Sequence, residues 1–250
     1  MKKQTQKTKS IALMGILTAL LILMAFTPIG YLKVGAISIS FLMIPVVIGA
    51  IALGPWAGAA LGGVFGITSF VQCFGMDVFG TFLMDINPFA TFIMCVGARV
   101  LAGFCAGLIA AAFKKSADTL HGNHRPGTAL ALRFAGYSVT GLCGALFNTL
   151  FFMGSLLLFF WKSTTFIEKM QEWGFDTSAI GKFFAAFVGT NAIVEAIAAF
   201  VIIGAISSAL YRARLIDALA IEKTKQVPND EAVADIEEKI ERIEEASKAD

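Results

Sequence analysis

Long apolar stretches limit the possible folds of this sequence more than any other feature. A helix needs roughly 20 apolar residues to cross the hydrocarbon core of a bilayer. Six stretches approach or exceed that length, namely residues 11–29, 37–53, 56–71, 88–113, 128–160 and 182–211. Charged residues make up only 15% of the chain, whereas soluble domains carry roughly 25%. We therefore predict an all-α, polytopic membrane protein with six transmembrane helices.

Charge divides the chain into two parts. Residues 1–215 hold 15 Lys/Arg and 7 Asp/Glu, whereas residues 216–250 hold 5 and 11. In the second part Val233, Ile236 and Ile240 follow the three-four spacing of an amphipathic helix. We therefore expect a six-helix transmembrane substrate-binding domain over 1–215 and an acidic, amphipathic cytoplasmic tail over 216–250. The tail is either a solvated helix or a docking helix.

The distribution of basic residues predicts the orientation. Lys and Arg are in excess in cytoplasmic loops of membrane proteins. If the N-terminus is inside, nine or ten of them lie in inner segments and four in outer ones. We therefore expect a multi-pass protein with both termini in the cytoplasm. The polar stretch 114–127 is then an inner loop.

Several function classes lack their sequence signatures here. No HExxH, GxSxG or GxxxxGK[ST] motif occurs, so we expect no enzyme and no site that hydrolyses ATP. The cysteines and histidines show no metal-ligand spacing, so we expect neither a metal nor a cofactor. The basic residues are scattered along the chain rather than clustered, and we expect no nucleic-acid partner.

Two ionisable residues, Arg99 and Glu195, lie deep inside apolar stretches. Each costs about 2.5–3.5 kcal/mol on membrane-insertion scales, so each needs a reason to be there. Asn148 lies at a similar depth in its own stretch, about 16–20 Å from the outer helix ends at 1.5 Å per residue. Asn191 is one helical turn from Glu195 and shares its face. We expect these four residues to form one polar cluster between the last three spans.

Two interpretations of this cluster remain open. In the first, Arg99 and Glu195 form a structural ion pair. In the second, the cluster is a ligand pocket in which Arg99 donates two hydrogen bonds to a substrate carboxylate, and Asn148, Asn191 and Glu195 bond amide and hydroxyl groups. The two interpretations are compatible if Glu195 holds Arg99 in position.

Outer loops would close such a pocket. The stretch 27–40 contributes Tyr31 and Lys33 as candidate ligand contacts, and the stretch 72–87 contributes Asp85. A later loop spaces Phe166, Met170 and Trp173 as on one helix face. We expect a short amphipathic helix there, which either lies on the membrane surface or packs as a lid.

Small residues at four-residue spacing mark close helix contacts in lipid. Gly15 and Ala19 have this spacing in the first apolar stretch, as do Gly58, Gly62 and Gly66 in the third. These rows serve either internal packing or docking against a separate membrane partner.

The first third of the chain resembles a known transporter family. The similarity rests on residues 12–20, TPIGYLKVG at 27–35, IPVVIGA at 44–50, LGP at 53–55, and the glycine-rich segment 58–66 with Ser69. Together these segments resemble the substrate-binding S components of energy-coupling factor (ECF) transporters. The similarity is sharpest over 11–70, and the acidic tail lies outside it.

The resemblance implies six helices in a bacterial cell membrane and capture of a water-soluble vitamin from outside. It also implies two kinds of partner, a transmembrane coupling protein and two ABC-type ATPases. The family's AxxxA motif, which meets the coupling protein, maps onto Gly15 and Ala19, with glycine in place of the first alanine. The sequence is most similar to pantothenate-type members, although folate, riboflavin or another vitamin stays open. The alternative is an independent secondary transporter of a small organic anion.

Overall fold

The computed structural model describes residues 2–34, 37–122 and 126–212, with side chains for 8–28, 30–31, 40–119, 128, 131–183, 195–207 and 209–210. The predicted tail over 216–250 lies outside the described residues. Within them, the secondary structure comprises α1 (Lys2–Ala25), a 3-10 turn (Pro28–Gly30), β1 (Tyr31–Val34), β2 (Ile37–Ser40), α2 (Met43–Leu53), α3 (Pro55–Gln72), α4 (Val78–Ile86), α5 (Pro88–Gly122), α6 (Pro126–Phe160), α7 (Thr164–Glu172) and α8 (Ile180–Arg212).

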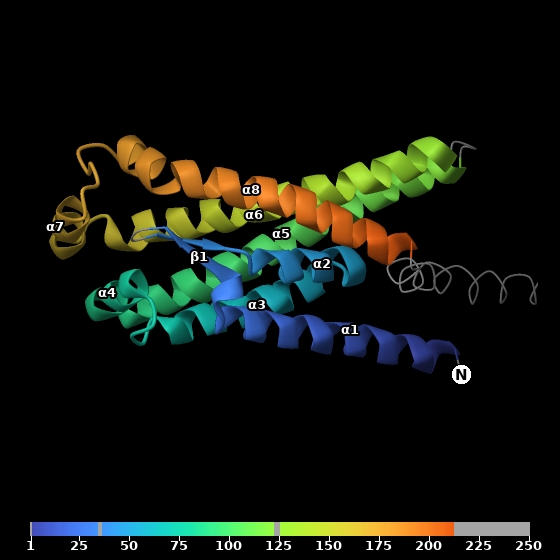
Figure 1. The fold of residues 1–250 in the computed structure, drawn as a ribbon, viewed down its shortest axis with the longest axis horizontal. Helices are drawn as coiled ribbons and strands as arrows, with labels where there is room; N and C mark the ends of the chain where they lie inside the picture. The colour runs from blue at the N-terminus through green and yellow to red at the C-terminus, as the bar shows by residue number, and fades with distance from the viewer. Residues whose placement is uncertain (1, 35–36, 123–125, 213–250) are drawn as a thin grey trace, which may run out of the picture.

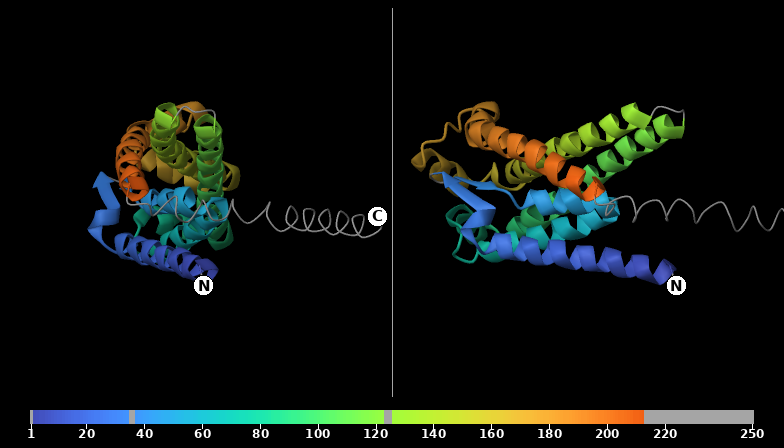
Figure 2. Two further views of the ribbon diagram at one scale, coloured as in Figure 1. Left: turned by 90° about the vertical axis from the view of Figure 1, so that its right-hand side faces the viewer. Right: turned by 45° about the vertical axis from the view of Figure 1, so that its right-hand side comes forward.

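The helices form an elongated bundle whose long axis follows α5 and α6 (Figure 1). α3 and α6 pack on α5, and α8 packs on α6. The short α2 contacts α1, α3, α5, α6 and α8, and nine of its eleven residues are buried. α4 and α7 close the end of the bundle that lies opposite the start of α1 (Figures 1 and 2). The bundle is thus organised around α2 at its middle and α4 and α7 at one end.

The predicted second span is wrong in its first part. Residues Ile37–Ser40 pair antiparallel with Tyr31–Val34, with Tyr31 opposite Ser40, and only Met43–Leu53 is helical. The reason is visible in the local pattern, because two isoleucines alternate with two serines, and a period of two favours a strand. The helical fold class is otherwise confirmed, with this hairpin as the exception among the described residues.

The ends of the long helices match the apolar stretches closely. α6 and α8 begin and end within two residues of the stretches 128–160 and 182–211. The polar loop expected over 114–127 is wrong, however, because α5 continues to Gly122 and α6 starts at Pro126. Asp118 and Arg133 form an ion pair across the two helices, and this contact supports the helical extension.

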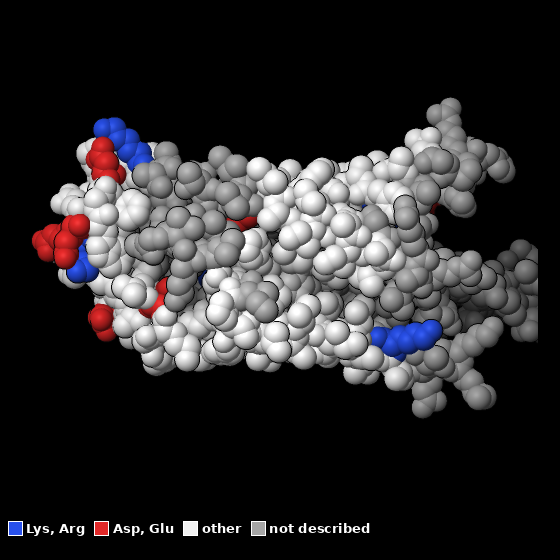
Figure 3. All heavy atoms as spheres, viewed as in Figure 1, with Lys and Arg blue, Asp and Glu red and all other residues white. Residues whose placement is uncertain are grey.

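Three described segments are long and apolar enough to cross a membrane, namely Thr8–Ala25, Pro88–Thr119 and Ala131–Phe160. The apolar helices Met43–Leu53 and Glu195–Ser207 are shorter within the described residues. Large apolar side chains lie exposed along the bundle, among them Ile16, Leu23, Leu101, Leu108, Leu150, Ile197 and Val201. On the face in Figure 3, charged side chains gather at the end formed by α4 and α7, and the long side is largely uncharged. These features fit a bundle surrounded by lipid, while the count of six spans stays a prediction.

Glycines bring α3 and α5 into backbone contact. A Cβ atom at Gly62 would collide with the carbonyl of Arg99, and one at Gly58 would collide with the carbonyl of Gly103. Gly66 lies just as close to the backbone of Val96. Small residues allow such an approach between helices in lipid. The internal-packing interpretation is therefore correct for the glycine row of α3.

The end formed by α4 and α7 has its own apolar core. Phe166 and Met170 of α7 are fully buried, together with Leu83 of α4 and Phe160 of α6. The Phe166 ring stacks on Phe82 with 6.4 Å between centroids. The predicted amphipathic helix is confirmed, and its apolar face packs on protein.

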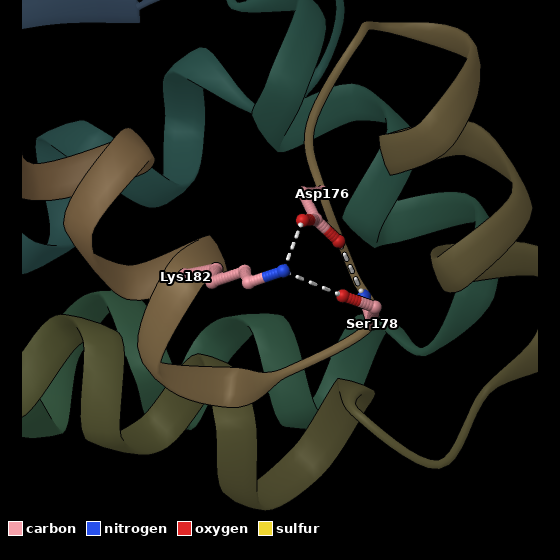
Figure 4. A network of polar contacts seen from close by, with 3 residues as sticks. All are labelled: Asp176, Ser178 and Lys182. Atoms are coloured by element: carbon pink, nitrogen blue, oxygen red, sulfur yellow. Dashed lines mark hydrogen bonds and ion pairs between the residues drawn. The ribbon is translucent and has the colours of Figure 1, made fainter.

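Polar contacts fix the chain where α8 begins (Figure 4). The Asp176 carboxylate accepts hydrogen bonds from the Ser178 backbone N–H at 2.8 Å and from Lys182 Nζ at 3.1 Å. These bonds from Ser178, and then from Lys182, lower the pKa of Asp176 to about 2. The carboxylate is therefore ionised at neutral pH and holds the loop against the first turn of α8.

We expect Gly62→Ala to destabilise the bundle by about 1–3 kcal/mol, because the new methyl group would force α3 away from the Arg99 carbonyl. Thermal unfolding in detergent measures the loss. Gly63→Ala is the matched control, since a Cβ there meets Val100 at 3.6 Å, an ordinary contact. Equal unfolding temperatures for the two variants would contradict the close contact.

Candidate functional site

Arg99 of α5 lies at the centre of the candidate site and is only 8% exposed. Its guanidinium lies between two aromatic rings, 4.9 Å from the centroid of Phe65 on α3 and 5.1 Å from that of Phe152 on α6. A cation over an aromatic face is stabilised, more so when it is shielded from water. The two rings therefore stabilise the charged group in the bundle interior.

The hydrogen bonds of Arg99 are incomplete. One terminal nitrogen donates to the carbonyls of Cys95 at 3.2 Å and Met94 at 3.5 Å. The Nε atom is buried and has no partner. A guanidinium has five N–H donors, and a buried donor without an acceptor costs about 1–3 kcal/mol. The site therefore has spare donors suited to an anionic or strongly polar ligand.

Asn148 of α6 is also 8% exposed, and its Oδ1 has no hydrogen-bond partner. It precedes Phe152 by four residues, so both side chains lie on the same helix face. Because Phe152 contacts Arg99, that face is directed toward the guanidinium. Asn148 thus adds an unpaired acceptor on the side of α6 that faces Arg99.

Tyr31 brings the hairpin to the same region. Its hydroxyl is buried, with the side chains of Gln72 and Ser69 close to it. Burial raises the pKa of this phenol, and the nearby positive charge of Arg99 opposes the rise. The tyrosine is therefore neutral at physiological pH and offers both a donor and an acceptor.

Glu195 of α8 accepts a hydrogen bond from the backbone N–H of Ser40 at 2.6 Å. This bond ties the second strand of the hairpin to α8. The ion pair between Arg99 and Glu195 that the sequence left open is not formed. The described ion pairs involve other residues, namely Arg133 with Asp118, Lys169 with Glu172, and Lys182 with Asp176. Glu195 therefore positions the hairpin, and Arg99 is left to the aromatic rings and to a ligand.

Three further residues were predicted to contact the ligand, and the structure describes the side chain of one of them. Asp85 is exposed on α4, and the contacts of Arg99 do not include it. Lys33 falls in β1 and Asn191 in α8, but the side chains of both lie outside the described residues. The structure thus brings Arg99, Asn148 and Tyr31 to one region, with Glu195 at its border.

Sequence analysis missed three residues of this region, namely Phe65, Phe152 and Ser40. The sequence did contain a signal for Phe152, because this residue follows Asn148 by one helical turn and so shares its helix face. Phe65 had none, since the chain contains 23 phenylalanines and a buried one is usually core. Ser40 contributes a backbone N–H, which the residue type does not reveal.

The structure defines an apolar helical bundle with a cluster of buried polar side chains in its interior. The family model described as "ECF transporter, substrate-specific component" matches residues 9–207, so the chain belongs to this family. A comparison with curated proteins found no match. Proteins of this family are substrate-binding subunits of transporters rather than enzymes, and they work with a membrane coupling protein and ATPases. The resemblance seen in the sequence is confirmed at the level of the family.

We expect Glu195→Ala to release the hairpin from α8. The Ser40 amide should then exchange its hydrogen up to about tenfold faster, because a hydrogen bond contributes about 0.5–1.5 kcal/mol to stability. Hydrogen exchange followed by mass spectrometry of peptides covering Ser40 measures the change. Glu195→Gln is the control, since an amide oxygen still accepts the bond and should preserve most of the protection. Unchanged exchange in the alanine variant would refute the link.

Proposed function

We propose that this S component binds a water-soluble vitamin that carries a carboxylate, with pantothenate as the best candidate. The observation that carries the proposal is the buried Arg99 guanidinium, held between two rings with its Nε unpaired. A carboxylate is the ligand group that best matches an Arg donor edge, because two parallel N–H···O bonds form. Such a ligand would satisfy the donors that the protein leaves free.

Pantothenate also matches the neutral groups of the site. It has one carboxylate, one amide and two hydroxyls. Asn148 offers an unpaired carbonyl oxygen and Tyr31 a buried hydroxyl, so both can bond the hydroxyl and amide groups. We include Asn191, Lys33 and Asp85 in the proposed site as further polar contacts. Glu195 takes part through the hairpin that carries Tyr31.

We further propose that the ligand enters from the outside and that both termini are cytoplasmic. The excess of Lys and Arg in the predicted inner segments supports this orientation. The end closed by α4 and α7 then faces outward, and these helices would form a lid over the site. Trp161 and Trp173 lie at this end, whereas Trp56 starts α3 far from it, as expected for two interfacial belts.

The proposed partners are one coupling protein in the membrane and two ABC-type ATPases. Gly15 and Ala19 lie on the exposed side of α1, and a Cβ at Gly15 would meet no atom within 4 Å. This row therefore serves no contact inside the described chain, unlike the glycines of α3. A groove lined by Ile11, Met14 and Trp56 lies on the same helix, further toward its start. We propose that this side of α1 docks the coupling protein.

The alternative of an independent secondary transporter has less support. The only hint of that function in the sequence was the presence of two ionisable residues, Arg99 and Glu195, inside apolar stretches, and the family match favours the substrate-binding subunit instead. Co-purification with a coupling protein and ATPases would separate the two functions directly.

Arg99→Ala should weaken pantothenate binding by about 10- to 100-fold, since hydrogen bonds to a charged group contribute about 1.5–3 kcal/mol. Arg99→Lys keeps the charge but loses the planar donor edge, so we expect an intermediate loss. Titration calorimetry on the purified protein measures both. Arg133→Ala is the control, because that arginine pairs with Asp118 instead. If the alanine variant stays folded and its affinity is unchanged, the pocket role is rejected.

Gly15→Leu should leave pantothenate binding intact and abolish uptake, because a large side chain would block close approach of the coupling protein. Uptake of labelled pantothenate by cells that express the complete transporter is the measurement. Gly154→Leu is the matched control, since Gly154 of α6 is also exposed and a Cβ there meets nothing within 4 Å. Normal uptake by the Gly15 variant would show that the coupling protein docks on another surface.

A further inference from the structure

Two buried cysteines meet beside Arg99. Cys73 ends α3 and Cys95 lies within α5, and their sulfur atoms are 3.9 Å apart. The two residues are 4% and 2% exposed. Cys105 and Cys143 are only partly buried, and no comparable sulfur contact involves them among the described residues. Within the described chain, Cys73 and Cys95 are thus the two cysteines whose thiols already lie next to each other.

The pair connects two functional parts of the molecule. The Cys95 carbonyl accepts a hydrogen bond from Arg99 at 3.2 Å, so Cys95 belongs to the turn that orients the guanidinium. Cys73 packs against the first turn of α4, where a Cβ at Gly80 would collide with its sulfur. Asp77 caps the same turn by accepting from the Gly80 N–H at 2.7 Å. A bond between the two sulfurs would therefore join the turn before α4 to the Arg99 segment.

The local backbone allows the sulfurs to come together. A disulfide has an S–S length of about 2.05 Å, so the sulfurs must approach by about 2 Å. Cys95 is held by the helical hydrogen bonds of α5, whereas Cys73 lies where α3 gives way to a turn. That turn contains Gly75 with φ +102°, and exposed residues follow Cys73 at positions 74–76. The movement therefore falls on Cys73.

We propose that Cys73 and Cys95 are a redox-reactive pair that a hydroperoxide converts into an intramolecular disulfide. One thiol loses its proton and attacks the peroxide O–O bond as the thiolate. It becomes a sulfenic acid, and the departing hydroxide, or the alkoxide from an organic peroxide, takes up the thiol's proton and leaves as water or an alcohol. The sulfur of the second thiol then attacks the sulfenic sulfur, an S–S bond forms and a second water leaves. The two sulfurs together lose two electrons, and these reduce the O–O bond. A dithiol reverses the reaction by thiol–disulfide exchange.

This disulfide does not depend on the identity of the transported ligand. It constrains the turn between α3 and α4 by a covalent link to α5. In the oxidised protein, hydrogen exchange over residues 74–80 should slow by about tenfold, because local opening of the turn is restricted.

The test uses the full chain in lipid nanodiscs, first reduced and then exposed to increasing hydrogen peroxide. Free thiols are alkylated under denaturing conditions, and peptides are analysed by mass spectrometry. We expect a peptide linked through Cys73 and Cys95, with Cys105 and Cys143 alkylated, and reversal by dithiothreitol. The double variant Cys105→Ser/Cys143→Ser should form the same link, and Cys73→Ser and Cys95→Ser should not.

A second measurement needs no substitution. Phenylarsine oxide bridges two neighbouring thiols with loss of one water, so it should bind the reduced wild-type protein once and protect Cys73 and Cys95 from alkylation. The proposal is overturned if both cysteines remain alkylated at peroxide concentrations that oxidise Cys105 or Cys143. It is also overturned if the arsenical fails to protect the pair.

Discussion

The close contact between α3 and α5 determines where the rest of the site can form. Gly62 lets the α3 backbone reach the carbonyl of Arg99, and three residues later α3 places the Phe65 ring over the guanidinium. With any side chain at position 62 the two helices would stand further apart, and the ring would no longer cover the charge. The glycine row is therefore as important to the site as the polar residues themselves.

The other half of the site is assembled by contacts between segments that are distant in sequence. Phe152 of α6 completes the aromatic pair around Arg99, and Glu195 of α8 fixes the hairpin through the Ser40 N–H. The hairpin in turn carries Tyr31, whose hydroxyl is buried. Each polar group that the site leaves unpaired therefore lies on an element that another part of the chain holds in place. This arrangement is what preorganised binding of a polar ligand requires, because few groups must be ordered when the ligand arrives.

Much of the fold and the centre of the site were predictable from the sequence, for physical reasons. The lengths of the apolar stretches closely predicted the first and last residues of α6 and α8. The free-energy cost of a charge in lipid identified Arg99 and Glu195 as residues of the site. What was missed depends on contacts that composition does not encode. The contact partners of Glu195 could not be inferred from depth alone, since depth does not give rotation about a helix axis. The second strand of the hairpin was hidden at the start of an apolar stretch. Only four residues there alternate with a period of two, and the apolar content of the whole stretch outweighs so short a pattern.

The brevity of α2 has a consequence for recognition. A helix of eleven residues rises about 16 Å, roughly half the hydrocarbon thickness, and the hairpin takes the place of the missing turns. Irregular backbone at such a depth is tolerated only where protein encloses it, and here Glu195 already satisfies one of its N–H groups. An unbroken helix would consume all of its main-chain donors internally. This interrupted segment instead leaves the Ser40 N–H to donate to a side chain of α8, and among substitutions at position 40 only proline would remove that donor.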